Sequence, residues 1–123
     1  MMNEEMRETY ELGCAVGRAA LKKGAEDVVL IDVHERMPMV DYFVVASADN
    51  ERLVRAVADD CDEALARAGV TPRRVEGNDT YRWLLIDAGR VVVHVFHVDE
   101  RDHYELAKLW RDCPQERLEA SDL

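Results

Sequence analysis

Apolar side chains recur along this chain with two different periods, and each period predicts a type of element. The segment 4–23 repeats its apolar positions every three or four residues, which is typical of an amphipathic helix, and Gly24 follows as its C-terminal cap. A second stripe of this period covers residues 50–68. Asp49 precedes it as the predicted N-cap, and Gly69 ends it.

Other segments are short and rich in β-branched or aromatic residues. The runs 28–33 and 42–46 are almost wholly apolar, which indicates strands covered on both faces, so we expect both to be central in a sheet. A short strand over 73–76 follows Pro72. Two further runs, 82–87 and 91–97, read as a closing β-hairpin.

The C-terminal part of the chain predicts a helix followed by a segment without a regular pattern. Asp99 with Asp102 three positions on resembles a capping box, and it predicts a final helix that ends before Pro114. We therefore expect one domain over residues 1–112 and a flexible tail over 113–123. Since helices and strands are mixed along the chain, the fold class is α/β, with a mixed sheet packed by about three helices.

The closing hairpin is the most informative segment, because side chains alternate across a strand. If Ala88 and Gly89 form a two-residue loop, Trp83 lies opposite His94, and Leu85 opposite Val92. One face is then wholly aliphatic, with Leu84, Ile86, Val91, Val93 and Val95. The other face mixes aromatic, charged and imidazole groups, as protein interfaces do, with Trp83, Leu85, Asp87, Arg90, Val92, His94 and Phe96.

Two alternatives remain open for this hairpin. A bulge at Gly89 would shift the pairing by one residue and mix the two faces, although their clean segregation favours the unshifted register. Trp83 is also consistent with a purely structural place under the last helix, with His94 hydrogen-bonded beside it. The sequence therefore makes Trp83 an interface candidate and leaves a core position as the alternative.

Composition narrows the class of partner. The chain has 123 residues, 48% of them hydrophobic and 34% charged, and no apolar run approaches the roughly 20 residues that span a bilayer, so we expect a cytoplasmic globular protein. Its 26 acidic and 16 basic residues give a formal net charge of −10. Such a surface repels nucleic acid and anionic lipid and attracts a basic protein. Cys14, Cys61 and Cys113 have no paired spacing, so we expect reduced thiols.

Signals for catalysis and for metal binding are weak. The four histidines are His34, His94, His97 and His103, and none is spaced from another as zinc or iron ligands usually are. Ser47 lacks the flanking glycines of a nucleophile elbow, and no glycine-rich phosphate loop occurs. We therefore expect no catalytic residue, metal or cofactor.

Several short motifs occur in the order in which one known protein family has them. They are 32–33, 41–45, 74–77, 82–89 and 92–97, followed by 100–101, 104–106 and 109–110. Over roughly residues 8–112 the chain thus resembles the ribosomal silencing factor family, RsfS, also called Iojap or YbeB. Several ordered motifs identify a family far more specifically than a single short one.

The resemblance implies both a fold and a function. The fold would be related to nucleotidyltransferases, with a mixed five-stranded sheet but no catalytic use. The function would be binding to the large ribosomal subunit through ribosomal protein number fourteen of the large-subunit series, at the surface that faces the small subunit. Occupying that surface would block subunit joining and lower translation, especially under nutrient limitation.

The family resemblance also sharpens the site. The tryptophan of the family's Arg-Trp motif is here Trp83, which falls on the mixed face of the hairpin. Buried aromatics carry affinity at protein interfaces, while charge mainly sets encounter rate and orientation. The predicted docking patch therefore consists of Asp79, Tyr81, Trp83, Leu85, Asp87, His94 and Phe96.

Two positions and one connector depart from the family pattern. Arg90 stands where an acidic residue is usual, Ala48 replaces a glycine, and the connector 37–39 replaces a serine-rich one.

Two rival functions remain. One rival is a nucleotidyltransferase-like enzyme, but Asp32 is a single carboxylate where that chemistry needs an Asp-x-Asp pair for two Mg²⁺ ions. The other is a dimeric interaction module unrelated to the ribosome, and a homodimer of the free protein is left open.

Overall fold

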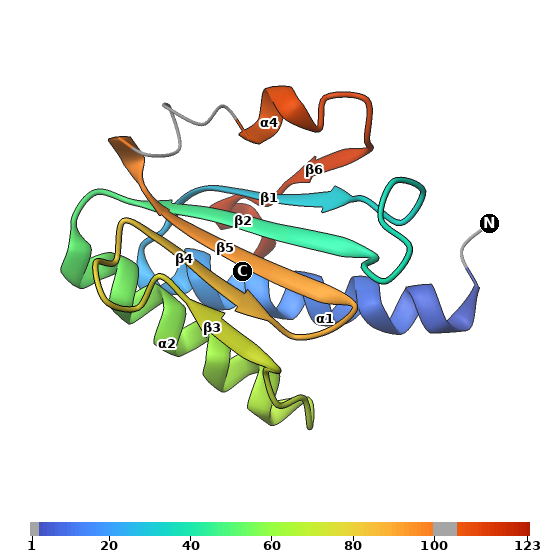
Figure 1. Ribbon diagram of the computed structural model, residues 1–123, viewed down its shortest axis with the longest axis horizontal. Helices are drawn as coiled ribbons and strands as arrows, with labels where there is room; N and C mark the ends of the chain where they lie inside the picture. The colour runs from blue at the N-terminus through green and yellow to red at the C-terminus, as the bar shows by residue number, and fades with distance from the viewer. Residues whose placement is uncertain (1–2, 100–105) are drawn as a thin grey trace.

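The computed structural model describes residues 3–99 and 106–123, and in it a single sheet has two long helices on one face (Figure 1). The long helices are α1 (Glu4–Lys23) and α2 (Glu51–Arg67), and a short helix α4 (Leu106–Leu109) and a 3-10 turn η1 (Ala120–Asp122) follow later. The strands are β1 (Glu26–Asp32), β2 (Tyr42–Ala48), β3 (Arg74–Glu76), β4 (Trp83–Asp87), β5 (Val91–His97) and β6 (Gln115–Arg117).

The sheet is mixed, as the order of elements predicted. Its strand order is β3-β4-β5-β2-β1-β6, in which β2 and β5 are parallel and every other neighbouring pair is antiparallel. The parallel pair is possible because α2 and the β3–β4 hairpin carry the chain back between β2 and β5. All seven residues of β2 are buried, which confirms its central place.

The helix ends follow their capping residues, with one difference from the expectation. The Asn3 side chain accepts a hydrogen bond from the Met6 backbone N–H at 2.8 Å, and Gly24 closes α1 with a φ of 116°. The N-cap of α2 is Asn50, whose side chain accepts from the Leu53 N–H at 2.8 Å. The predicted cap, Asp49, was wrong by one residue.

Two apolar clusters lie on opposite faces of the sheet. The first joins α1 and α2 to the sheet and contains the aliphatic face of the hairpin, including Leu84, Ile86 and Val93. The second lies on the other face, where no long helix of the described chain packs, and it contains Phe43, Val45, Val92 and Phe96 among its buried members. The sheet therefore has apolar side chains on both faces, but only one of these faces is covered by α1 and α2 (Figure 1).

The segment 113–123, which was expected to be a flexible tail, contains a sixth strand, so the prediction of five strands was wrong. Strand β6 pairs antiparallel with β1, with Arg117 opposite Val29 and Gln115 opposite Ile31. Just after it, Leu118 is only 6% exposed and packs so closely on Gly17 that a Cβ there would overlap its methyl group. The sequence hid this strand because all three residues of β6 are exposed and polar, and it is bound through its backbone.

We expect Leu118→Ala to lower the free energy of unfolding by about 2 to 3 kcal/mol, because it empties a buried site between α1 and β1. Urea denaturation measures the change. Leu123→Ala is the matched control, since the same truncation five residues later removes a side chain that is 57% exposed. Equal stability of the two variants would contradict the docked position of the C-terminal segment.

The final helix is described only in part. The structure has α4 at Leu106–Leu109, within the segment predicted to be helical, whereas Asp102 of the proposed capping box lies outside the described residues. In the described part of the chain, no helix is both long and apolar enough to cross a bilayer.

The hairpin has the predicted faces but not the predicted register. Trp83 lies opposite Phe96, Leu85 opposite His94, and Asp87 opposite Val92, so every partner is shifted by two residues. The reason is the turn: the two-residue loop is Gly89-Arg90, closed by a hydrogen bond of 3.0 Å from the Ala88 N–H to the Val91 carbonyl. Gly89 has a φ of 86°, which hairpin loops of the Gly-x type require at their first position.

A shift of two residues keeps the side chains of β4 and β5 on their predicted faces, so the segregation is confirmed for the two strands. Arg90, which was predicted on the mixed face, lies instead in the turn, and its guanidinium reaches Glu5 of α1. The aliphatic face belongs to the helix-covered core, and Trp83, Leu85, Val92 and Phe96 belong to the other cluster.

Arg90, which departs from the family pattern, has a structural role in this chain. Its guanidinium binds Asp41 at 2.7 and 3.1 Å, and a third nitrogen lies 3.0 Å from Glu5 of α1. Asp41 is only 5% exposed, so its carboxylate needs this partner. Arg90 therefore joins the hairpin turn to the start of β2 and to α1.

Candidate functional site

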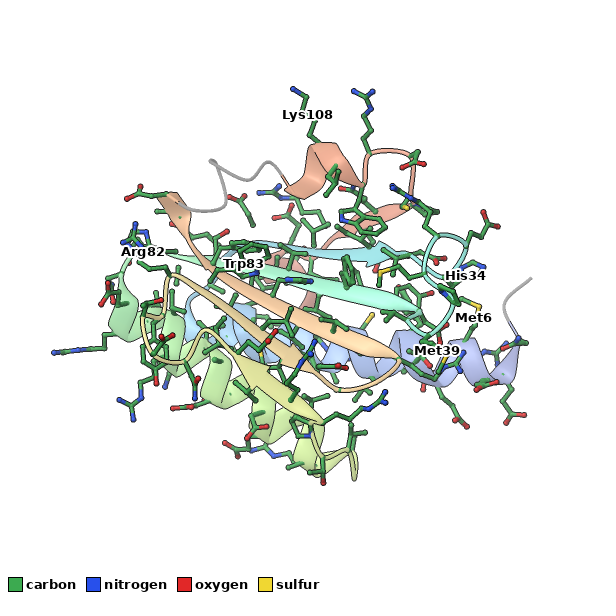
Figure 2. The ribbon with its side chains drawn as sticks, viewed as in Figure 1. Met6, His34, Met39, Arg82, Trp83 and Lys108 are labelled. Carbon is green, nitrogen blue, oxygen red and sulfur yellow. The ribbon has the colours of Figure 1, made fainter. Side chains whose placement is uncertain are left out.

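An aromatic cluster lies on the face of the sheet opposite the two long helices. It consists of Phe43, Trp83, His94, Phe96 and Trp110. Trp83 stacks on Phe96 with ring centroids 4.9 Å apart, and Phe43 forms T-shaped pairs with His94 at 4.8 Å and with Trp110 at 5.0 Å. Figure 2 shows Trp83 over the sheet on the side that faces away from the helices.

A hydrogen bond orients Trp83 within this cluster. Its indole Nε1–H donates to His94 Nδ1 at 3.2 Å. Because Nδ1 accepts, the neutral imidazole carries its proton on Nε2. Among the residues that the structure describes, this Nε2–H has no acceptor. The predicted pairing of Trp83 with a neighbouring His94 therefore exists, although the two residues are diagonal neighbours across the hairpin rather than opposite each other.

The imidazole of His94 is neutral near pH 7. Its side chain is almost fully buried, and this desolvation lowers the pKa of His94 to about 4 from its ordinary value of 6.5. The cluster consequently presents aromatic and neutral surface, with no cationic imidazole.

The lowered pKa of His94 predicts that the folded protein is less stable in acid. Between the unfolded pKa of 6.5 and the folded pKa of about 4, the unfolded chain binds a proton that the folded chain does not, so the free energy of unfolding falls as the pH falls. The loss through this window approaches roughly 3 kcal/mol at the acid end. Urea denaturation at several pH values from about 7.5 to 4.5 measures it.

Two variants separate the effect of His94 from that of His34, the other described histidine whose pKa is shifted. His94→Asn keeps an acceptor for the Trp83 indole and removes the titrating group, so its stability should depend less on pH in this window. His34 has the opposite sign, because its hydrogen bond with Asp32 raises the pKa of His34, and that stabilisation is lost as the pH rises. His34→Asn should therefore steepen the acid loss, and an unchanged slope in His94→Asn would refute the assignment.

The structure brings five of the seven predicted site residues together. Trp83 and Leu85 are half-buried at the surface, whereas His94 and Phe96 are buried beside and beneath them. Asp87 lies at the margin, and its carboxylate accepts a hydrogen bond from the Gly89 N–H at 3.0 Å. These five residues share the face of the aromatic cluster.

The remaining two predicted residues lie elsewhere. Tyr81, with a φ of 56°, packs against the helix-covered core, and the guanidinium of Arg55 lies 5.8 Å from its ring centroid. Asp79 is exposed in the loop before β4, where its carboxylate accepts from the Thr80 N–H at 3.0 Å. Tyr81 therefore does not share the face of Trp83, because the two residues lie two positions apart but the chain turns between them before β4 begins.

The structure adds a groove that sequence reasoning missed. This hairpin groove, of about 240 Å³, lies beside the aromatic cluster, between the hairpin turn and the connector from β1 to β2. Its apolar lining is Met37, Met39, Val40, Phe43, Leu85 and Val92, and its polar lining includes Arg73, Arg74, Asp87 and His94. The only sequence signal was the unusual Met-Pro-Met connector, which carries the exposed Met39, labelled in Figure 2.

The other residues that could suggest chemistry have structural roles. Asp32, the carboxylate of the enzyme alternative, binds His34 at 2.5 Å and accepts from its backbone N–H at 3.2 Å. Burial raises the pKa of the Cys61 thiol to about 12, so this cysteine is a protonated core residue. In the described ranges, no three histidine, cysteine or acidic side chains gather as metal ligands would.

Comparison with known proteins identifies relatives over the whole chain. The family model described as ribosomal silencing factor during starvation matches residues 3–123. The ribosomal silencing factor RsfS of Halalkalibacterium halodurans is 40% identical over 119 residues, which are 97% of either chain. A mouse protein named mitochondrial assembly of ribosomal large subunit protein 1 is 30% identical over 92 residues, which are 72% of this chain and 40% of that one.

A solved structure agrees with these sequence relatives. The crystal structure of a protein from Chromobacterium violaceum superposes with a TM-score of 0.79 at 32% identity, over 82% of this chain and 84% of that one. The family match includes the C-terminal segment with β6, which the sequence motifs did not reach. The chain therefore belongs to the ribosomal silencing factor RsfS family, whose members regulate translation as non-enzymatic, ribosome-binding factors.

Proposed function

We propose that this protein binds the large ribosomal subunit through ribosomal protein number fourteen of the large-subunit series and sterically blocks association with the small subunit. The observation that carries the proposal is the aromatic cluster on the sheet face that no long helix of the described chain covers. Membership in the ribosomal silencing factor family supports a ribosomal target. The name of the mouse relative, which refers to the large ribosomal subunit, supports the choice of subunit.

The proposed docking patch is centred on Trp83 and Leu85. Both side chains are half-buried, so each keeps surface that a partner can desolvate. Tryptophan is among the residues most enriched at the energetic centre of interfaces, particularly where its position is already ordered. Here the stack on Phe96 and the hydrogen bond to His94 order the indole in advance.

The rest of the predicted patch surrounds this centre. Asp87 lies at its margin, and the negative charge of the whole chain favours approach to a basic ribosomal protein. Asp79 and Tyr81 stay predictions, and Tyr81 would join the contact only if the partner also reaches the helix-covered side of the sheet. A relation of the fold to nucleotidyltransferases is likewise part of the proposal and rests on the family resemblance.

Purified ribosomal subunits test the proposal. The protein is incubated with large subunits, small subunits are added, and joined ribosomes are followed on a sucrose gradient. We expect the protein to sediment with the large subunit while the joined peak falls in proportion to its occupancy. An unchanged joined peak at saturating protein would overturn the proposal. A free homodimer that ignores both subunits would support the dimeric-module alternative instead.

A further inference from the structure

The hairpin groove combines an apolar floor with a polar wall that carries two arginines, Arg73 and Arg74, and one carboxylate, Asp87. Val40, Leu85 and Val92 line it from three different segments, and Met39 at its rim is 73% exposed, the largest exposed fraction among the large apolar side chains of the described chain. A volume of about 240 Å³ is below the usual range of small-molecule sites, which begins near 300 Å³. The groove is therefore sized for a protein side chain.

Arg73 supplies the cation on the wall. Its side chain runs close over the turn, since a Cβ on Gly89 would lie 3.9 Å from both its Cδ and its Nη1. No carboxylate of the described residues forms an ion pair with Arg73, whereas the neighbouring Arg74 lies 3.8 Å from Glu76. An unpaired arginine beside an apolar groove is notable in a chain of net charge −10, where carboxylates are abundant.

A second polar group also lacks a partner at this place. His94 lines the groove, is 5% exposed, and has no acceptor for its Nε2–H within the described ranges. A buried donor without an acceptor is costly, but this Nε2 is closed to solvent, so an occupant of the groove meets the His94 ring and not this donor. Arg73 is therefore the group that favours an occupant with a carboxylate.

We propose that the hairpin groove binds a short segment of the large-subunit partner in which an apolar side chain fills the groove and an adjacent carboxylate pairs with Arg73. This inference rests on the proposed function and adds a local requirement to it. The partner as a whole is basic and is attracted by the net negative charge, but the segment that enters the groove is acidic and apolar. Local pairing of this kind sets orientation, because it is satisfied in only one register.

The overall negative charge and the local pairing of Arg73 with a carboxylate predict opposite effects of Arg73→Glu on affinity. Arg73→Glu and Arg52→Glu each lower the formal net charge of −10 by two units. Arg52 is exposed on α2, on the other side of the sheet, so it controls for net charge alone. If only the overall charge mattered, both variants would bind a basic partner as tightly as the wild type or more tightly.

Affinity for purified large subunits is measured by co-sedimentation at two salt concentrations for the wild type and both variants. We expect Arg73→Glu to weaken binding by about tenfold or more, and Arg52→Glu to change it by less than about twofold. Arg73→Lys keeps the charge and should retain most of the affinity. Met39→Ser, which removes an exposed apolar side chain from the rim, should weaken binding without unfolding the protein.

The outcomes separate this inference from the function it rests on. If the wild type binds and Arg73→Glu binds equally well or better, the pairing of a partner carboxylate with Arg73 is refuted, while the proposed function stands. If Arg52→Glu weakens binding as much as Arg73→Glu, the loss is not specific to the groove, and the pairing of a carboxylate with Arg73 is again refuted. If the wild type itself does not bind large subunits, the proposed function fails.

Discussion

Trp83→Ala is expected to lower affinity for the large ribosomal subunit by about a hundredfold, which corresponds to roughly 2.7 kcal/mol. Trp83 is half-buried on the proposed docking face, and its indole is held in place by the stack on Phe96 and the hydrogen bond to His94. Truncation to alanine removes the apolar surface that the indole offers to the partner. It also removes the stack and the hydrogen bond that order this surface before binding, so the partner would have to order the remaining side chains. Co-sedimentation with purified subunits measures the change.

Two further variants show whether the effect is local. Trp83→Phe keeps a ring on Phe96 but loses the donor to His94, so it should lose less affinity than Trp83→Ala. Trp110→Ala removes the other tryptophan of the aromatic cluster, which lies under the Arg36 guanidinium and against Phe43. It disturbs the same cluster at a point away from the hairpin, and we expect it to retain most of the affinity.

A folded Trp83→Ala protein that co-sediments as well as the wild type would refute the docking face. Equal losses in Trp83→Ala and Trp110→Ala would point instead to the integrity of the whole cluster. Thermal unfolding and circular dichroism establish that each variant is folded before its affinity is compared.

Gly77→Ala is expected to produce the largest loss of stability, about 3 kcal/mol or more. Gly77 has a φ of 84°, a conformation that costs an L residue about 1 to 2 kcal/mol by itself. In addition, a Cβ at this position would overlap the carbonyl oxygen of Trp83. Backbone cannot move aside as a flexible side chain can, so the loop between β3 and β4 would have to open.

Gly69→Ala provides the matched control, because it separates the backbone conformation from the overlap. Gly69 has a φ of 78°, close to that of Gly77, but a Cβ there meets no atom within 4 Å. Its alanine variant should therefore lose only the conformational cost of about 1 to 2 kcal/mol. Urea denaturation measures both variants, and equal losses would show that the approach of Gly77 to Trp83 is not rigid.

Opening this loop would also affect the candidate site. Gly77 contacts the first residue of β4, which is Trp83 itself, so Gly77→Ala should weaken large-subunit binding in the fraction that stays folded. The glycine thus links the stability of the loop to the position of the indole.

Local sequence patterns were sufficient for the long elements. The amphipathic period determines α1 and α2, and the β-branched runs determine β1 and β2, because each pattern extends over enough residues to exclude the other period. The faces of the hairpin were also predictable, since alternation along a strand does not depend on which residue lies opposite. Trp83 was therefore correctly placed on the mixed face.

Patterns that involve few residues were not sufficient. The hairpin register depended on whether Gly89 is the first or the second residue of the turn, and both positions accept a glycine in some turn type. The N-cap of α2 depended on a choice between Asp49 and Asn50, two good capping residues in succession. In each case the alternatives differ by one residue and have similar local energies.

The sequence by itself determined the α/β class, the two long helices, the segregation of the hairpin faces and the family resemblance, because these depend on repeated local patterns and ordered motifs. Only the tertiary structure decided that β6 completes the sheet, that Arg90 binds the buried Asp41, and that Tyr81 lies on the face opposite Trp83. The hairpin groove, between the connector from β1 to β2 and the hairpin turn, also exists only in the tertiary structure. These features join residues far apart in the chain, and their energies come from backbone pairing, desolvation and packing that no local pattern encodes.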